Sequence, residues 1–404
     1  MTASVDMEKR PAAELQDDLP ADLEALVFHR REASAPRLRL WAGGDVGFSG
    51  RLAALAGEKG PGPLEELAPV LHRGDLAFAN LETPLVAERR DGDLFAAPLD
   101  AAHRLEAAGF SLLSLANNHI RDHGGEGLAS TREALARAGI LGLGAGSDEV
   151  EARSLRMLER QGLSFGWLAC GRTLQDQPGP GPKFWEYSPE EVLAAVRQAA
   201  PTTDLLAVSL HLGYMFVDYP HPDHRRLALE LAGAGAHLVL MHHAHVLQGV
   251  EVTADGSVIC YNLGNLLFDW TEGEVPGLEE IEHQRSGALF GFDLDQQGVA
   301  QAFTLPFYVD DDWKLRWARG TAGASILDRL ERISSAWGGN FEEEFWRQRA
   351  ERNTGQTIST LARKLRRGEL GVLLDAGRRL RPHHLRMLLR WAGGRFSNRR
   401  GSRP

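Results

Sequence analysis

A long alternation of strand-like and helix-like segments constrains this fold more than any other feature. Apolar runs typical of strands lie at 37–43, 76–82, 111–118, 164–171, 204–213, 237–245 and 257–269. Patterns typical of helices lie at 99–110, 127–139, 188–200 and 224–236. Strands that alternate with helices over this length are typical of an α/β domain with parallel strands. We expect the sequence up to about residue 310 to add antiparallel strands.

Residues at the ends of the helical patterns support this assignment. Gly109 and Gly139 end helical patterns, as C-cap glycines do. Ser188 precedes Pro189 and stands three residues before Glu191, which is a typical sequence signature of a helix N-terminus. The sequence therefore marks where these helices begin and end.

The segments on either side of the domain at 37–310 differ from it in composition. Residues 1–36 are polar and acidic, and we expect a leader with one short helix around Leu23–His29. Residues 321–404 are expected to form a helical extension that ends in an arginine-rich, basic tail. This tail is either a solvated segment or an amphipathic helix that lies on an anionic membrane. The amphipathic helix would comprise Leu385, Leu388, Leu389 and Ala392 on one face and Arg381, Arg386 and Arg390 around it.

The composition argues against several classes of protein. A net charge of -10 over 404 residues argues against nucleic-acid binding, which relies on clustered positive charge. The sequence has no secretory signal and no run near the roughly 18 apolar residues of a spanning helix, so we expect a cytoplasmic protein. Peripheral membrane contact is expected only through the basic tail. Cys170 and Cys260 lie in apolar, strand-like runs and are expected to be reduced.

Polar side chains follow the apolar part of six successive strand-like runs, which comprises residues 37–43, 76–79, 111–116, 204–210, 237–241 and 257–261. Because ligands of α/β sheets bind beyond the carboxyl ends of the strands, we expect these side chains to meet. They are Asp45; Asn80 and Glu82; Asn117, Asn118, His119 and Asp122; His211; His242, His243 and His245; and Asn262 and Asn265. Carboxylate, amide and imidazole groups without thiolate favour Mn²⁺, Fe²⁺ or Zn²⁺. Two such ions held close together clamp a phosphoryl group and activate a bridging water.

Six motifs, in their order and spacing, resemble the CapA family of bacterial capsule and poly-γ-glutamate synthesis proteins. They are GGDVGFSG, FANLETPL, SLANNHIRDHGGEGL, SLHLG, MHHAHVLQGVE and YNLGNLLFD, and together they span roughly residues 37–270. The fold of that family resembles the calcineurin-like metallophosphoesterases. The resemblance therefore implies a metallophosphoesterase-like four-layer α/β/β/α sandwich. It also implies divalent metal ions as cofactors, two in number.

The same resemblance implies roles for individual residues. Asp45 and His245 resemble ligands of a first metal ion, and Glu82 resembles the carboxylate next to both ions. The implied ligands of a second ion are Asn118, His211 and His243. His119 resembles the histidine that protonates the leaving group in phosphoesterases, and Asp122 is placed to orient it. The side chains assigned to substrate binding are Asn80, Asn117, His242, Asn262 and Asn265.

Some of these residues also have a simpler, structural interpretation. Asn117 suits a turn or a helix cap, and Asp122 suits a brace for the turn that follows it. Asn262 and Asn265 flank Gly264, so they are either turn residues or part of a substrate pocket.

The histidines of HLVLMHHAH divide by position. On an extended segment side chains alternate between faces, so His243 and His245 are expected to point one way and His242 the other. This alternation makes His243 and His245 the predicted ligands and His242 a supporting neighbour. His237 is expected to be a bystander before the strand.

Three functional interpretations follow. The primary one is a hydrolase with a dinuclear metal site that acts on a phosphoester or amide-type bond in polymer synthesis. The second is a non-catalytic accessory subunit that binds a polyanionic polymer or a partner synthetase. It is favoured by Gly47, which stands where phosphoesterases have the histidine of Asp-x-His. The third is a tailoring enzyme for an amino acid or peptide, compatible with the altered motif HLGYMF.

Overall fold

A computed structural model of the chain describes residues 7–16, 19–35, 37–56, 60–88, 95–172, 177, 180–269 and 284–366, with side chains up to residue 353. Its internal contacts define two compact units. The first comprises Met1–Thr271 and Glu282–Glu342, and the second comprises Glu272–Ile281 and Glu343–Pro404. The predicted amphipathic helix of the basic tail lies outside the described residues. Within the described ranges, no helix combines the length and apolar character needed to span a membrane.

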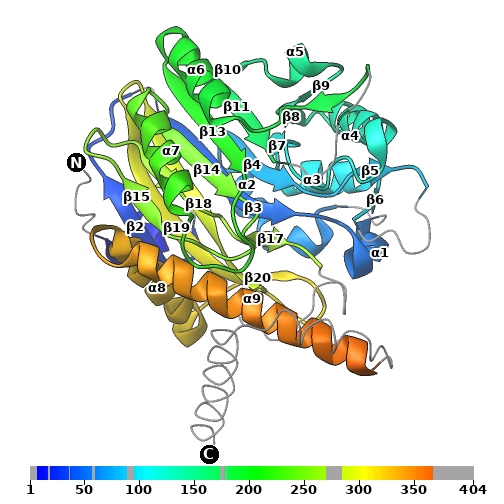
Figure 1. Ribbon diagram of the computed structural model, residues 1–404. Helices are drawn as coiled ribbons and strands as arrows, with labels where there is room; N and C mark the ends of the chain where they lie inside the picture. Colours follow the sequence, from blue (N-terminus) through cyan, green and yellow to red (C-terminus); the bar gives the residue numbers. More distant parts are fainter. Residues whose placement is uncertain are drawn as a thin grey trace, which may run out of the picture. The chain divides into compact units, whose positions relative to one another are not determined.

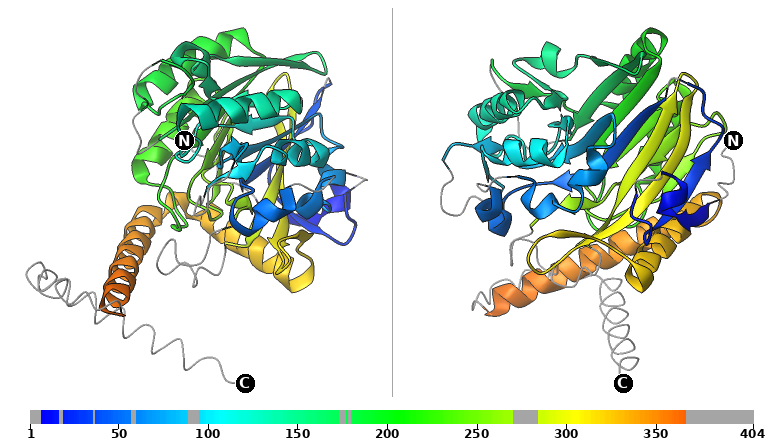
Figure 2. Two further views of the ribbon diagram at one scale, coloured as in Figure 1. Left: turned by 90° about the vertical axis from the view of Figure 1, so that its right-hand side faces the viewer. Right: turned by 180° about the vertical axis from the view of Figure 1, so that it is seen from behind.

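The larger sheet of the first unit has ten strands in the described part of the chain (Figure 1). Its main path is β1 (Glu8–Pro11), β2 (Glu24–Arg30), β19 (Gly298–Val309), β18 (Ser286–Asp295), β3 (Leu38–Val46), β4 (Leu76–Leu81), β7 (Leu112–Ser114) and β8 (Leu141–Leu143). Two more strands pair with this path: β17 (Asn265–Leu267) with β3, and β20 (Leu315–Trp317) with β19. The strands β3, β4, β7 and β8 are parallel, whereas β1, β2, β18 and β19 pair antiparallel. Seen from behind, the yellow hairpin β18–β19 lies beside blue strands of the same sheet (Figure 2).

The smaller sheet has six strands and a parallel centre. Its order is β10 (Arg156–Arg160), β11 (Leu163–Gly171), β13 (Leu205–His211), β14 (Leu238–His242), β16 (Val258–Cys260) and β15 (Val250–Val252). The strands β11, β13, β14 and β16 are parallel. Two short ladders pair β5 (Leu85–Val86) with β6 (Ala97–Pro98) and β9 (Ala145–Gly146) with β12 (Lys183–Phe184).

Helices connect the strands along the chain. The α-helices of the described residues are α1 (Ala53–Ala56), α2 (Ala68–Leu71), α3 (Ala101–Ala108), α4 (Gly124–Arg137), α5 (Glu149–Ala152), α6 (Pro189–Ala199), α7 (Pro222–Gly233), α8 (Gly320–Ser334) and α9 (Phe341–Arg366). Short 3₁₀ helices are η1 (Ala12–Glu14), η2 (Gly50–Leu52), η3 (Gly62–Leu64), η4 (Ala200–Thr202) and η6 (Ser335–Gly338). The predicted helix ends are present: Gly109 adopts φ 104°, and Ser188 Oγ accepts the N–H of Glu191 at 3.3 Å.

The alternation of side chains along the strands produces four layers. In β13, Leu205 and Ala207 pack in the apolar core between the two sheets, whereas Leu206 packs in the core beneath α6 and α7. In β3, Leu40 faces the core between the sheets, whereas Trp41 packs with residues of α3 and α4. Three apolar cores therefore separate helices, sheet, sheet and helices, with α6 and α7 in front of the smaller sheet in Figure 1. The predicted four-layer α/β/β/α sandwich is confirmed.

Two segments differ from the expectations at the ends of the domain. The predicted short helix at Leu23–His29 is wrong, because Glu24–Arg30 forms β2 and pairs with β19. Its side chains alternate as in a strand, with Leu26 and Phe28 in the core between the sheets. The strands β1 and β2 are thus part of the larger sheet rather than of a separate leader. At the other end, α8 inserts Leu327 and Leu330 into the core between the sheets, so the first unit continues past residue 320.

A pair of glycines lets β3 approach β17 at the end of the sheet. The register of β3 shifts here, just before Asp45, and the Asp45 N–H donates to Gly264 O at 2.9 Å. A Cβ on Gly44 would lie 2.0 Å from that backbone oxygen. A Cβ on Gly43 would instead lie 3.0 Å from a terminal methyl group of Leu266, which can move.

We therefore expect Gly44→Ala to lower the free energy of unfolding by about 3 kcal/mol, as overpacking against rigid backbone does. Gly43→Ala is the matched control and should cost less than about 1 kcal/mol, because a side chain can yield. Urea unfolding followed by circular dichroism measures both. Equal losses in the two variants would contradict the close backbone approach at Gly44.

Candidate metal centre

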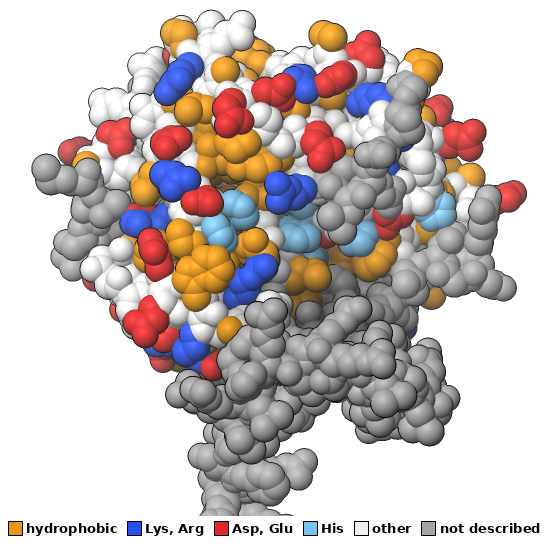
Figure 3. All heavy atoms as spheres, in the orientation of Figure 1, with side chains coloured by type: hydrophobic (Ala, Val, Ile, Leu, Met, Phe, Trp, Pro, Cys, Tyr) orange, Lys and Arg blue, Asp and Glu red, His pale blue; other side chains and the backbone are white. Residues whose placement is uncertain are grey.

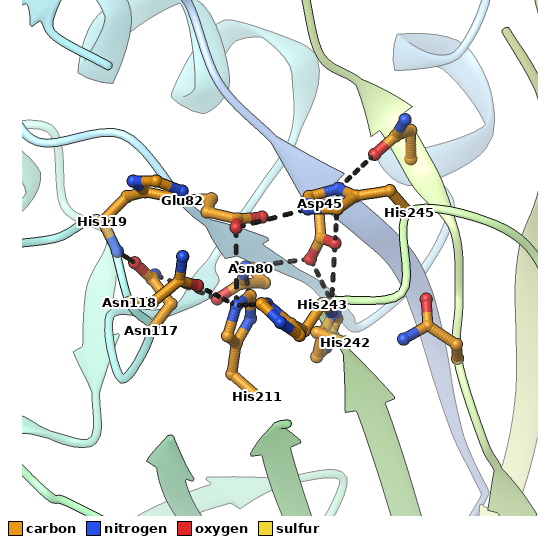
Figure 4. A network of polar contacts seen from close by, with 12 residues as sticks. Asp45, Asn80, Glu82, Asn117, Asn118, His119, His211, His242, His243 and His245 are labelled. Atoms are coloured by element: carbon orange, nitrogen blue, oxygen red, sulfur yellow. Dashed lines mark hydrogen bonds and ion pairs between the residues drawn. The ribbon is translucent and has the colours of Figure 1, made fainter. Parts of the chain in front are cut away.

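The predicted polar residues lie where the parallel strands of both sheets end (Figure 4). Asp45 of β3 is paired in register with Asn80 of β4. In the other sheet, His211 ends β13 and is paired in register with His242, which ends β14. Because the carboxyl ends of both sheets face the same place, residues far apart in the sequence converge there.

Asp45 is the hub of a buried hydrogen-bond network. Asn80 Nδ2 donates to Asp45 Oδ1 at 2.9 Å, and His242 Nδ1 lies 3.1 Å from the same oxygen. Burial acts to raise the pKa of this carboxyl, but the hydrogen bond from His242 and the nearby imidazoles outweigh burial and lower it. Asn80 and His242 are both fully buried. They therefore orient Asp45, and they do not face a surface open to substrate as the sequence assignment proposed.

Glu82 is a fully buried carboxylate without a hydrogen-bond donor. Neither of its side-chain oxygens has a hydrogen-bond partner among the described residues. The nearest imidazole nitrogens are Nε2 of His211 and Nε2 of His245, at 3.4 and 3.6 Å from Oε1. Burial raises the pKa of Glu82 to about 7. A buried, unpaired carboxylate is costly, and a bound cation is one way to compensate it.

Four donor atoms converge on one side of Glu82. His211 Nε2 lies 2.7 Å from Asn118 Oδ1, 3.2 Å from His243 Nδ1 and 3.4 Å from Glu82 Oε1. Ligands of a tetrahedral ion at about 2.1 Å stand about 3.4 Å apart. Burial lowers the pKa of His211 to about 3 and that of His243 well below its usual range. Both rings are therefore neutral, which is the form that binds metal ions.

His245 approaches Glu82 from the other side. Its Nδ1 lies 2.8 Å from Asn265 Oδ1, and the amide nitrogen of Asn265 donates to Gln284 O at 3.3 Å. This orientation of the amide makes Nδ1 of His245 the donor and directs Nε2 toward Glu82. Asn265 therefore positions an imidazole, which differs from its assigned role in substrate binding. Asp45 Oδ2 lies 3.4 Å from the same ring.

The donor set fits a divalent cation. Two groups of candidate ligands have their donor atoms within 4.8 Å of one another: Asp45, Glu82 and His211, and Glu82, His243 and His245. Glu82 belongs to both groups. Carboxylate, amide and imidazole donors of this kind suit Mn²⁺, Fe²⁺ or Zn²⁺, as the sequence predicted.

A left-handed turn brings His243 and His245 to the centre. The strand β14 ends at His242, and His243 and His245 adopt φ 91° and φ 55°. The predicted alternation of an extended strand is therefore wrong here, although both rings do reach Glu82. The turn is held by the His243 N–H, which donates to Asp45 Oδ2 at 3.2 Å, and by the Phe216 N–H, which donates to Ala244 O at 2.8 Å. Such backbone costs about 1–2 kcal/mol per residue, so these contacts must maintain it.

His119 lies beside the centre and reaches its surface. Its Nδ1 is 2.8 Å from Asp122 Oδ2, and their side chains are 20% and 23% exposed. The ring of Phe95 stacks on His119 with a centroid distance of 3.8 Å. Asn117 accepts the backbone N–H groups of His119 and Ile120, as in the turn interpretation.

Some side chains follow the structural interpretation, and others were not foreseen. Asn262 Oδ1 accepts the Gly264 N–H at 2.9 Å, so Asn262 shapes a turn. Sequence reasoning missed Phe95 and also Phe268, whose ring centroid is 5.3 Å from that of His245. Phe95 directly follows no described strand, and Phe268 follows β17 as one apolar residue of an apolar run, so neither position indicated a role at the centre.

Comparison with known proteins identifies the family. A model of the bacterial capsule synthesis protein PGA_cap matches residues 39–270, more than half of the chain. The chain belongs to this family. The family predicted from the sequence motifs is thereby confirmed.

Two relatives from other bacteria show how similar the chain is to known proteins. The chain is 26% identical over 317 residues to the capsule biosynthesis protein CapA of Bacillus anthracis, covering 72% of this chain and 73% of that protein. It is 29% identical over 288 residues to a probable polyglutamine synthesis accessory protein of Mycobacterium tuberculosis, covering 65% and 73%. Among solved structures it is similar to the calcineurin-like phosphoesterase YfkN from Bacillus subtilis, with 10% identity, a TM-score of 0.36, and coverage of 76% and 98%.

The PGA_cap chain has no space for a side chain at Gly47. A Cβ at this position would lie 2.7 Å from Cγ2 of Thr83 and 3.1 Å from the ring of Phe268. These two side chains occupy the region that a histidine at position 47 would need. Position 47 therefore supplies no imidazole to the centre.

In protein stripped of metal by a chelator, we expect Glu82→Gln to be more stable than wild type at pH 8. Burial raises the pKa of Glu82 from 4.5 to about 7, so its stabilising contribution is complete below pH 4.5 and is lost as the pH rises through 7. The full difference corresponds to about 3 kcal/mol. Urea unfolding at pH 5 and pH 8 measures it.

The exposed Glu106 of α3 supplies the control. Glu106→Gln should follow the wild type at both pH values. With Zn²⁺ or Mn²⁺ added, the order at pH 8 should reverse, because Glu82→Gln removes a ligand. A Glu82→Gln protein that loses as much stability as wild type between pH 5 and pH 8 would refute the buried, unpaired carboxylate.

Proposed function

We propose that this PGA_cap protein is a metal-dependent hydrolase of capsule or polyglutamate-type polymer synthesis. It would cleave a phosphoester or amide-type bond at a dinuclear centre. The observation that carries this proposal is the position of Glu82, a buried carboxylate without donors that is shared by two groups of candidate ligands. The residues assigned to hold the two ions are Asp45, Glu82, Asn118, His211, His243 and His245.

The side chains of the centre would each have a separate role in hydrolysis. Bound divalent ions would supply an activated water and would stabilise developing negative charge. Asp122 forms a hydrogen bond with Nδ1 of His119. The other ring nitrogen, Nε2, would therefore transfer a proton to the leaving group. Phe95 covers one face of the imidazole and holds the ring in place. His119 is partly exposed, so a substrate can reach it.

A non-catalytic accessory role is the second candidate. It is favoured by Gly47, where Thr83 and Phe268 fill the space and position 47 supplies no imidazole to the centre. A centre of this kind can still bind metal and thereby rigidify a surface for a polyanionic polymer or a partner synthetase. The described relative from Mycobacterium tuberculosis is itself named an accessory protein.

The double substitution His243→Ala, His245→Ala is expected to remove bound metal. Hydrolysis of bis(p-nitrophenyl) phosphate with added Mn²⁺ should fall more than about tenfold, since the loss of even an outer partner of a metal ligand costs that much. Elemental analysis of the purified protein measures the metal, and absorbance measures the hydrolysis. His103→Ala, on the exposed face of α3, is the matched control and should change neither quantity.

The outcomes separate the two candidate functions. Unchanged metal content in the double variant would show that the ligand assignment is wrong. The accessory role would be favoured if the wild type binds metal that the double variant loses, and if the wild type cleaves neither a phosphoester nor an amide.

A further inference from the structure

An arginine lies directly beside the candidate metal centre, outside the ligand set. Arg172 follows the last residue of β11, and its backbone N–H donates to His211 O at 3.1 Å. Its side chain is exposed. The guanidinium lies 6.0 Å from the ring centroid of Tyr187, and it forms no ion pair with the described residues. Because no described carboxylate pairs with it, this cation at the carboxyl edge of a parallel sheet is placed to meet a ligand.

Two histidines and a tyrosine lie on the segment that follows His211, whose carbonyl accepts the Arg172 N–H. The ring of Tyr214 lies 5.6 Å from that of His221 and 6.3 Å from that of His224, nearly parallel to the latter. His224 Nδ1 is buried and has no hydrogen-bond partner among the described residues. Burial, followed by the charges of His221 and Arg172, lowers the pKa of His224 to about 4. The space-filling view shows histidine side chains next to cationic and apolar side chains on this face (Figure 3).

The loop that carries Tyr214 also borders the metal centre. It begins after the candidate ligand His211 and continues to Phe216, whose ring centroid is 6.1 Å from that of His245. Tyr214 therefore lies between two residues that adjoin the centre. A group bound at Arg172 would be close enough to belong to the same substrate molecule.

The nearby carboxylates do not neutralise Arg172. Asp223 forms an ion pair with Arg226 at 2.9 Å and lies 3.7 Å from His221 Nδ1. Asp218 is bound to Arg329 at 2.5 Å. In a chain with a net charge of -10, this leaves a local positive site at the rim of the centre. Arginine binds carboxylate and phosphate oxygens in a bidentate manner, and aromatic rings beside it restrict its position.

We propose that Arg172, His224 and Tyr214 form a subsite that binds an anionic group of the substrate, a carboxylate or a phosphate, next to the bond at the metal centre. The inference rests on the proposed function, because it treats the bound anion as part of the substrate. It restricts that substrate to molecules with a negative charge close to the reacting bond. A repeating acidic polymer has this property at every unit.

Binding by the metal-loaded full chain tests the subsite without turnover. The probes are a fluorescein-labelled short oligomer of glutamate, the matching oligomer of glutamine, and unlabelled linear polyphosphate as a competitor, with fluorescence anisotropy as the readout. We expect the wild type to bind the anionic probe and not the neutral one. Arg172→Gln should weaken binding about tenfold or more, as the loss of a charge-assisted hydrogen bond does. His224→Phe, which keeps a ring of similar shape, should weaken it about threefold or more.

Arg226→Gln is the matched control, since Arg226 is an exposed arginine on α7 that is already paired with Asp223. It should change the affinity less than about twofold, and all variants should keep the wild-type metal content. Direct binding of the glutamate oligomer would show that the subsite accepts a carboxylate, and its displacement by polyphosphate would show that phosphate binds at the same place. Equal affinity in Arg172→Gln and wild type, or no anion binding by wild type, overturns the subsite. Binding that depends on Arg172 in a protein without hydrolytic activity would retain the subsite and refute the hydrolase.

Discussion

Two buried carboxylates, Asp45 and Glu82, impose the constraint on which the rest of the site depends. Both are fully buried at the end of a large apolar sandwich. Asp45 is stabilised by donors from Asn80 and His242, whereas Glu82 has none. A protein interior does not accept an ionised carboxylate without compensation. Burial keeps His211 and His243 beside Glu82 neutral, the form of imidazole that binds metal ions, so the compensation that fits is a metal ion.

This constraint explains the unusual backbone near the carboxylates. The turn at His243 and His245 has positive φ at two residues whose side chains disfavour it. The same turn donates a backbone N–H to Asp45, so the carboxylate that needs donors also stabilises the strained turn. Gly44 lets β3 approach the backbone at Gly264, which places Asp45 at the junction of the two sheets. The strained turn and the close approach of two backbone segments therefore both lie next to the buried carboxylates.

The sequence predicted the sandwich and the meeting of the strand ends because both follow from short-range patterns. Apolar alternation defines β13 and its two faces, and each strand end carries a polar side chain. The turn at His243 could not be predicted in this way, because its backbone is set by contacts with Asp45 of β3 and with Phe216 of the loop after β13. The strand β2 was missed because its pairing partner, β19, lies more than 250 residues away in the sequence.

The same limit applies to the roles of individual side chains. Asn80 lies near the end of β4 and Asn265 begins β17, both beside candidate ligands, and only their hydrogen bonds show that Asn80 orients Asp45 and Asn265 orients His245.

The absence of a histidine side chain at Gly47 affects both the packing around the centre and the set of its ligands. Thr83 and Phe268 fill the space that a histidine would require, so the packing there is complete without it. The imidazoles among the candidate ligands then come from His211, His243 and His245 alone. An ion bound by Asp45 would have one nitrogen ligand fewer than in a protein with Asp-x-His and would be held more weakly. Arg172, at the His211 end of the centre, could then supply part of the attraction for an anionic substrate that a tightly held ion would otherwise provide.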